Sequence, residues 1–450
     1  MENLKESLIA RIWQCQLLDG TELVTEDGEP ISVIYPGRIN DDRGADFRDA
    51  VISTRHGLRK GDVEVHIKSS DWRAHRHHRD SNYNRVILHV VMWHDSGVTT
   101  HLQSGGETSI LALRKYIKTP YNQWNKLAGT PASSSLPCHR AVERLETSII
   151  TEFLDNGGGE RFLTKADKFQ ANLAQMTPSQ SLYQGIMGAL GYAKNKLPCL
   201  ELARRLPLQA LEALNQDRLS DEDYLARQQA WLLGTAGLLP SQCPDWYRWG
   251  VSDDRWAEKL ENLWVSSRHG EVMSVNDWHL FKVRPNNFPV RRLVAMSYLA
   301  LRYREQGIFE GVVNKIKEVP INKGHRELEK ALLITTGGYW ASHWALGCNC
   351  RMGIPTLLGS RRAADIVVNV LLPFTFAWSR FTSQPELARK AFELYCHYPR
   401  LEVNTVERHM SHQLGLNSDL VSSAQRQQGL IHIYNNLCAQ GECHRCPFGG

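Results

Sequence analysis

Two acidic residues and one histidine near the start of the chain have the spacing of a metal-dependent hydrolytic site. Asp46 precedes a predicted strand over residues 47–54, and Glu64 and His66 lie in the next predicted strand, over residues 62–68. Because side chains alternate along a strand, Glu64 and His66 point to the same face. Two carboxylates can hold Mg²⁺ or Mn²⁺, which takes its other ligands from water and phosphate, while a basic neighbour positions or activates the attacking water. We therefore predict Asp46 and Glu64 as ligands of a catalytic metal, with His66 beside them.

A run rich in histidine and arginine follows this strand. Six of the eighteen histidines lie between residues 66 and 94, and residues 71–80 have the sequence DWRAHRHHRD. On a single helix, these side chains would form a polar surface for phosphates or an auxiliary metal beside Asp46 and Glu64. A solvated, charged helix is the other interpretation. The residues predicted to bind substrate are Asn40, Asp71, Arg73, His75, His77 and Asp80.

The elements that must position these residues follow one another in an α+β or α/β order. Three strand-like segments with alternating or continuous apolar residues come before the histidine-rich run, and one more follows it. An amphipathic helix precedes them all. The predicted order is helix, three strands, helix, strand, over residues 2–17, 31–35, 47–54, 62–68, 71–80 and 85–93.

This order and the Asp–Glu–His spacing resemble the PD-(D/E)XK nuclease superfamily. The resemblance implies a nuclease-like domain over residues 1–117, with Asp46 as the first metal ligand and Glu64 as the second. Ala45 stands where the motif name has proline, and His66 stands where it has lysine. Imidazole is neutral for much of the time at pH 7, whereas lysine is a fixed cation. Lys68, two residues along the same face, could supply that cation if the end of the strand curls back.

The chain as a whole is similar to a bacterial family, domain of unknown function 2851. The similarity rests on short segments in both halves of the sequence and implies no particular reaction. These segments are PGRIN at 36–40, GADF at 44–47, GDVEVH at 61–66, SDWRAHRH at 70–77, VILHVV at 86–91, LGY at 190–192, RPNN at 284–287, RR at 291–292, NVLLP at 369–373 and RQQGLIH at 426–432.

The remainder of the chain is predicted to be helical. A proline- and serine-rich linker over residues 118–140 separates the nuclease-like domain from a large all-α domain over residues 141–434, where apolar residues recur at three- and four-residue spacing. Gly157–Gly159 lacks the strand and lysine of a phosphate-binding loop, so we expect a helix break there. Residues 435–450 form a cysteine-bearing tail.

Three cysteines in this tail, Cys438, Cys443 and Cys446, are spaced as C-x4-C-x2-C. Three thiolates so close together suit a structural Zn²⁺ or an iron–sulfur cluster, each of which usually takes a fourth ligand. In some nucleases of the resembled superfamily, an iron–sulfur cluster with a distant cysteine ligand attaches such a tail to a helical domain. Three reduced thiols on a frayed terminus are the alternative. The candidates for the fourth ligand stay open, and they are His432, His444, Cys396, Cys348 and Cys350.

Composition and charge exclude several classes of protein. With 450 residues, 42% hydrophobic and 22% charged, the chain has the composition of a globular protein of two or three domains, not a disordered or collagen-like one. Ten cysteines are too few for a disulfide scaffold, and the net charge of +5 is compatible with a nucleic-acid partner. The first residues lack the apolar stretch of a signal peptide, and the longest apolar run is too short for a bilayer. We therefore expect a cytoplasmic protein without a membrane partner.

The leading hypothesis is a Mg²⁺- or Mn²⁺-dependent phosphodiesterase, an endo- or exonuclease acting on DNA. One alternative is a catalytically degenerate fold that binds nucleic acid through Arg73, Arg76 and Arg79 without cutting it. The other is a zinc hydrolase of a small phosphorylated or amide substrate, with metal ligands His66, His75 and His77.

Overall fold

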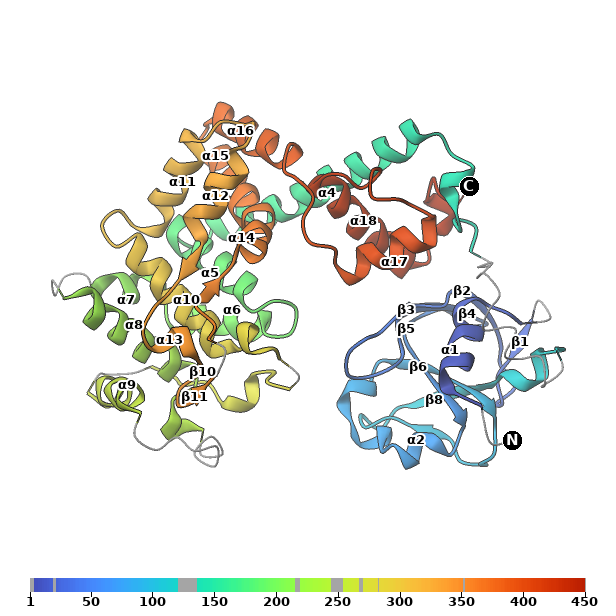
Figure 1. Cartoon of the computed structure of the whole chain (residues 1–450). Helices are drawn as coiled ribbons and strands as arrows, with labels where there is room; N and C mark the ends of the chain where they lie inside the picture. Colours follow the sequence, from blue (N-terminus) through green and yellow to red (C-terminus); the bar gives the residue numbers. More distant parts are fainter. Residues whose placement is uncertain are drawn as a thin grey trace. The chain divides into compact units, whose positions relative to one another are not determined.

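The computed structural model of the chain divides into two units, which are described separately (Figure 1). The sheet unit comprises residues 1–158, 403–421 and 426–450, and the helical unit comprises residues 159–402 and 422–425. This division differs from the predicted one, because the sheet unit includes helices that follow the linker and the cysteine tail. Residues 120–135 of the predicted linker lie outside the described residues. Those described are 4–18, 22–119, 136–214, 219–243, 254–266, 270–281, 283–350 and 353–449.

A mixed eight-stranded sheet organises the sheet unit. Its main order is β1-β2-β4-β5-β6-β8-β7, with β3 paired to β4. Strands β2, β4 and β5 pair antiparallel, whereas β5, β6 and β8 pair parallel, and Glu64 of β5 is in register with His89 of β6. The strands are β1 (Leu23–Val24), β2 (Pro30–Tyr35), β3 (Arg38–Ile39), β4 (Phe47–Thr54), β5 (Gly57–Lys68), β6 (Val86–Trp93), β7 (Thr100–His101) and β8 (Glu107–Ala112).

The predicted α+β organisation of the N-terminal part, followed by a helical part, is confirmed. Helix α1 (Glu6–Gln14), strands β2, β4 and β5, the short helix α2 (Asp71–Ala74) and strand β6 follow one another in the predicted order. Four strands were not predicted. Of these, β1, β3 and β7 are only two residues long, too short to show a periodicity, and β8 lies next to β6 in the sheet.

The single helix predicted over residues 71–80 is wrong. Helix α2 ends at Ala74, and Arg76 has a left-handed backbone with φ of 63°. Two 3-10 turns follow, η1 (His77–Arg79) and η2 (Ser81–Tyr83). A left-handed residue reverses the local path of the chain, so arginines at three-residue spacing here do not share one helix face.

Helix α1 covers one face of the sheet. Its Ile9 and Trp13 are fully buried and belong to the same apolar cluster as Val63 and Val65 of β5. Because side chains alternate along β5, Glu64 and His66 point to the opposite face, as predicted.

Residues that follow the linker pack against the second face of β2 and β4, which is why the sheet unit extends beyond the linker. Tyr35 of β2 and Val51 of β4 lie in an apolar cluster with residues from far later in the chain, among them Leu154 and Leu430. The Tyr434 hydroxyl donates a 2.8 Å hydrogen bond to Asp49. Apolar strand residues need cover, and here it comes from the start of α4 (Thr147–Leu173), α17 (Thr405–Leu414), α18 (Ala424–Asn436) and the tail.

Helix α4 also shows that the predicted break at Gly157–Gly159 is wrong, because the helix continues through all three glycines. A Cβ atom at Gly157 would lie 3.4 Å from the Gly429 backbone, and one at Gly429 would lie 2.0 Å from the Leu154 carbonyl oxygen. The glycines therefore allow α4 and α18 to approach closely.

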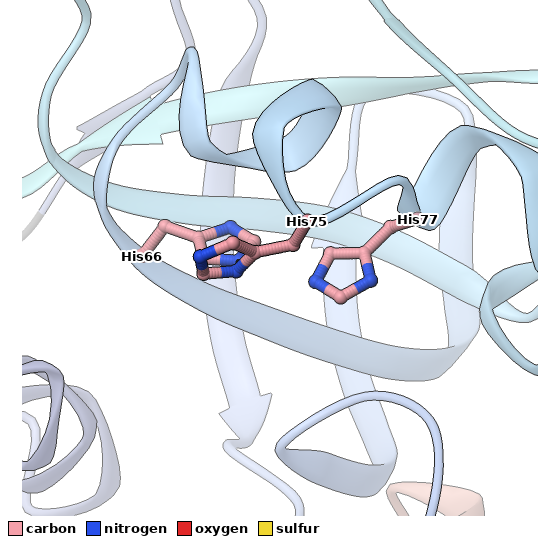
Figure 2. A group of neighbouring side chains, drawn as sticks. All are labelled: His66, His75 and His77. Atoms are coloured by element: carbon pink, nitrogen blue, oxygen red, sulfur yellow. The ribbon is translucent and has the colours of Figure 1, made fainter.

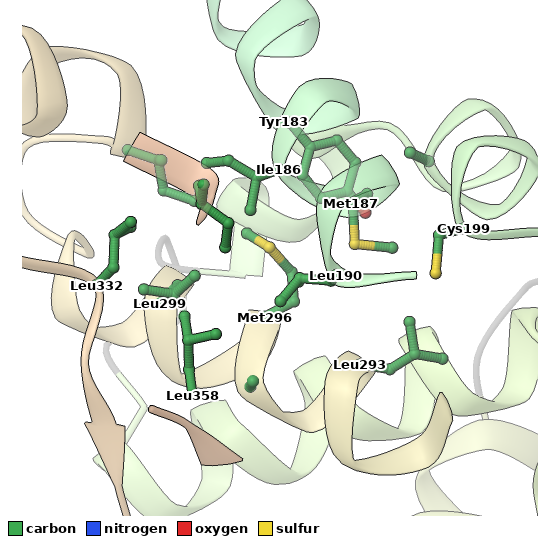
Figure 3. Packing of buried hydrophobic residues seen from close by; sticks show 14 of the residues in the cluster. Tyr183, Ile186, Met187, Leu190, Cys199, Leu293, Met296, Leu299, Leu332 and Leu358 are labelled. Carbon is green, nitrogen blue, oxygen red and sulfur yellow. The ribbon is translucent and has the colours of Figure 1, made fainter. Parts of the chain in front are cut away.

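The helical unit is built around one large apolar cluster (Figure 3). It is not entirely helical, because two small two-stranded sheets pair β9 (Ile334–Thr335) with β12 (Thr356–Leu358) and β10 (His343–Ala345) with β11 (Cys348–Asn349). Arg291, fully buried, donates to carbonyl oxygens on both sheets. The helices after α4 are α5 (Pro178–Leu190), α6 (Lys196–Arg205), α7 (Leu208–Glu212), α8 (Asp221–Thr235), α9 (Arg255–Val265), α10 (Pro289–Arg302), α11 (Ile308–Glu318), α12 (Gly324–Leu332), α13 (Tyr339–Ser342), α14 (Ser360–Ile366), α15 (Leu372–Phe381) and α16 (Pro385–Cys396).

A membrane-crossing helix needs a long apolar stretch, and none of the helices in the described ranges provides one.

The contact between α4 and α18 predicts opposite effects for two glycine substitutions. Gly429→Ala would press a methyl group against the Leu154 carbonyl, so we expect overpacking to lower the stability by about 1–3 kcal/mol. Gly159→Ala is the control, because a Cβ there has no neighbour within 4 Å and alanine favours a helix by about 0.5–1 kcal/mol. Thermal unfolding of both variants checks this. An unchanged melting temperature for Gly429→Ala would show that the two helices do not pack as described.

Candidate active site

Asp46 and Glu64 are held side by side by the backbone of each other's strand. The Asp46 N–H donates to Oε2 of Glu64 at 3.0 Å, and the Val65 N–H donates to Oδ2 of Asp46 at 3.0 Å. Asn40 stabilises the loop that leads to Asp46, since its side-chain amide donates to the Ala45 carbonyl at 2.8 Å. These bonds fix the position of both carboxylates before any ligand binds.

Three imidazoles lie close together (Figure 2), and Glu64 lies next to two of them. His66 comes from β5, His75 follows α2, and His77 opens η1. Their ligand atoms all lie within 4.8 Å of one another, and Nε2 of His66 is 3.2 Å from Nδ1 of His75. Oε1 of Glu64 is 3.5 Å from Nε2 of His66 and 3.2 Å from Nε2 of His77. Because of the left-handed turn at Arg76, the side chains of His75 and His77 both lie next to His66, although they are two residues apart.

A second layer of polar groups orients His66 from behind. Nδ1 of His66 is 2.9 Å from Nε2 of His89, and Nδ1 of His89 is 3.0 Å from the Thr100 hydroxyl. If the His66 Nδ1–H donates to His89, and the His89 Nδ1–H donates to Thr100, then Nε2 of His66 presents a lone pair to the cluster. A hydrogen bond behind a histidine fixes its tautomer in this way at metal sites.

The charges in this cluster are poorly compensated. Burial, together with the neighbouring Asp46 carboxylate, raises the pKa of Glu64 to about 9, and burial also raises the pKa of Asp46. Burial and the surrounding histidines lower the pKa of His66 to about 2, and burial lowers that of His77. His66 and His77 therefore resist the positive charge that would offset the carboxylates. A bound cation would supply that charge, and it would stabilise the charged form of both acids.

The donor set fits such a cation. Metal–nitrogen bonds of about 2.0–2.1 Å place neighbouring ligand atoms of a tetrahedral site about 3.3–3.4 Å apart. Three of the six separations among Glu64, His66, His75 and His77 are close to this value, at 3.2, 3.5 and 3.2 Å, and the ligand atoms of the three histidines all lie within 4.8 Å of one another. Mixed imidazole and carboxylate ligands suit Zn²⁺ and Mn²⁺ better than Mg²⁺, which prefers oxygen alone.

Comparison with known protein families assigns the chain to one of them. Residues 6–404 match the model of a family described as "Protein of unknown function (DUF2851)". The chain belongs to this family. Neither a curated protein nor a solved structure matches it. The region that matches DUF2851 includes Asp46, Glu64 and the three histidines, whereas the three tail cysteines lie beyond it.

Other residues predicted for this site point elsewhere. The Lys68 side chain is 55% exposed, and its ammonium is 3.9 Å from Asp95. Asp71 accepts from the Lys68 N–H at 2.9 Å, and Asp80 accepts from both amide groups of Asn82. Arg73 is exposed. None of these four residues belongs to the histidine cluster.

Two residues near the cluster were not predicted as site residues. Glu6, in the first turn of α1, has its pKa raised by burial, and the charges of Asp46, His75 and His77 all act on it. His89 is fully buried behind His66. The crowding of histidines between residues 66 and 94 included His89, but only the parallel pairing of β5 with β6 places it behind His66.

The predicted tail ligands also have defined places. Cys438, Cys443 and Cys446 line a common cavity, together with Cys138. His432 forms a 3.1 Å hydrogen bond with the Asn436 amide, and Cys396 belongs to the helical unit.

The raised pKa of Glu64 predicts that this carboxylate destabilises the metal-free fold. Its pKa is about 9 in the fold and ordinarily 4.5, so the folded state loses stability as the pH rises through that window. We expect Glu64→Gln to raise the melting temperature in the presence of a chelator, and by more at pH 8 than at pH 5. Glu107→Gln is the control, because its carboxylate is 62% exposed. A lower melting temperature for Glu64→Gln at both pH values would contradict this account of the site.

Proposed function

We propose that this DUF2851 protein is a divalent-metal-dependent phosphodiesterase that cleaves DNA, as an endo- or exonuclease. The observation that carries the proposal is the pair of carboxylates held together by backbone hydrogen bonds, half-buried Asp46 and buried Glu64, with imidazoles facing Glu64. The resemblance of Asp46, Glu64 and His66 to the PD-(D/E)XK motif supports the same reaction and stays a prediction.

Glu64, His66, His75 and His77 are the residues that would hold the metal, with Asp46 beside them. A bound Mn²⁺ or Zn²⁺ would supply a Lewis acid for a phosphoryl oxygen and would lower the pKa of bound water. Asp46 is half-buried and keeps one carboxylate oxygen on the Val65 N–H, so it is positioned to orient a water molecule or a second cation. His66 cannot serve as the fixed cation that lysine provides, because its pKa is far below 7.

The surroundings of the cluster favour a phosphate backbone as substrate. The segment that supplies His75 and His77 also carries Arg73, Arg76 and Arg79, all exposed. Exposed guanidinium groups bind phosphates without regard to sequence, and the net charge of +5 favours approach to DNA.

A second candidate is a zinc hydrolase of a small phosphorylated or amide substrate. The specific observation that favours it is the convergence of three imidazoles, which is typical of catalytic zinc. Metal content separates the two candidates in part, because tightly bound zinc in this cluster with no cleavage of DNA would favour the small-substrate hydrolase.

The proposal predicts cleavage that depends on Glu64. We expect the wild type to cut linear, nicked or single-stranded DNA with Mn²⁺, and Glu64→Gln and Asp46→Asn each to lower the rate by at least about 100-fold, because each removes a charge that balances the metal. A gel assay on a mixed panel of substrates measures this, with Glu107→Gln as the matched carboxylate control. Folded, metal-loaded wild type that cuts none of the panel would overturn the nuclease and leave a DNA-binding module or the small-substrate hydrolase.

The arginines predict how binding depends on salt. We expect the double variant Arg73→Gln/Arg79→Gln to bind DNA more weakly and to reduce the slope of log affinity against log salt by about one for each lost phosphate contact. Arg55→Gln, an exposed arginine at the turn between β4 and β5, is the control. Fluorescence anisotropy over a range of salt concentrations measures both slopes. Equal slopes for the double variant and the wild type would show that the DNA lies elsewhere.

A further inference from the structure

Four cysteines from two distant parts of the chain line one small cavity of the sheet unit. Cys138 lies shortly before α4, whereas Cys438, Cys443 and Cys446 lie in the tail. The cavity has a volume of about 10 Å³, which is about the room that one water molecule needs. All four thiols are free.

Hydrogen-bond donors are directed at these sulfurs. The Gln413 side-chain amide donates to Sγ of Cys138 at 3.1 Å, and it also favours the thiolate form of Cys438. The backbone N–H groups of Phe448 and Gly449 lie near the sulfur of Cys446 and favour its thiolate form. A thiol is a weak acceptor, whereas a metal-bound thiolate gains from each such donor. Such donors would stabilise the sulfurs in the thiolate form that a bound metal requires.

The segments on either side of the cavity are also joined by Arg144. Its guanidinium donates to the carbonyl oxygens of Pro137 and Phe448, one next to Cys138 and the other close to Cys446. The charge of Arg144 also acts on the Cys138 thiol. A cationic group here would offset part of the negative charge of four thiolates around a metal.

We propose that Cys138, Cys438, Cys443 and Cys446 bind one thiophilic metal centre, Zn²⁺ or an iron–sulfur cluster, with Cys138 as the fourth ligand. Four thiolates complete the coordination of either centre. The cavity volume suits a single ion, whereas the C-x4-C-x2-C spacing also occurs in iron–sulfur proteins. The centre is structural, since it closes the tail onto the segment before α4 within the apolar cluster that covers Tyr35 and Val51. It does not depend on the proposed nuclease activity.

Metal analysis of protein purified without oxygen tests this proposal. The measurements use a His75→Ala/His77→Ala background, so that the thiol centre is counted apart from the candidate active site. We expect about one zinc per chain, or about two to four irons with matching sulfide and visible absorbance, to survive dialysis. Cys138→Ser should retain about tenfold less metal, whereas Cys15→Ser, also buried in the sheet unit, should retain the full amount.

Two further measurements apply if Cys138→Ser does not fold. Gln413→Ala removes the donor to the Cys138 sulfur but no ligand, so it should lose metal to a chelator faster than the Cys15→Ser control. Chelation of the background protein should expose four thiols to a thiol reagent and lower the melting temperature. Zinc or iron bound to these cysteines would each support the centre, and absorbance and sulfide distinguish them. Background protein without stoichiometric zinc or iron, or Cys138→Ser with the full content, would overturn it.

Discussion

The reciprocal bonding of Asp46 and Glu64 is the interaction on which the account of this protein depends. Each carboxylate accepts a backbone N–H from the other's strand, so the sheet itself brings two acids together in a buried place. Burial raises the pKa of both acids, that of Glu64 to about 9. His66 and His77 do not relieve this, because burial lowers their own pKa values. Carboxylates and imidazole nitrogens gathered in one place, without a positive charge between them, favour the binding of a cation.

The rest of the sheet unit covers the strands next to that pair and so keeps the pair in place. Helix α1 covers the Val63 and Val65 face of β5, and residues from α4, α17, α18 and the tail cover Tyr35 and Val51 on the neighbouring strands. The same C-terminal elements place three of the four thiols next to Cys138. A metal there would secure the cover of the sheet, while the candidate active site would keep its own ligands.

Periodicity in the sequence was enough to predict the strands that carry Glu64 and His66 and to place both side chains on one face. It could not predict the left-handed turn at Arg76, which breaks the expected helix and directs His75 and His77 to the cluster. Cys138 and His89 were beyond such analysis for a different reason. Their roles arise from contacts between segments far apart in the chain, and no local pattern encodes them. The glycines of α4 misled the prediction because the helix continues through them, and Gly157 allows the close approach of α18.

Pulsed electron paramagnetic resonance of Mn²⁺ bound to the chain would test the central claim most directly. The account predicts one tightly bound Mn²⁺ with couplings to imidazole nitrogen, and weaker nitrogen coupling in His75→Ala/His77→Ala, which keeps only the His66 imidazole. It also predicts weaker binding in Glu64→Gln, since the buried charge that faces the imidazoles is then gone. Mn²⁺ that binds without nitrogen coupling, or with equal affinity to wild type and Glu64→Gln, would contradict the claim that these residues form a metal centre.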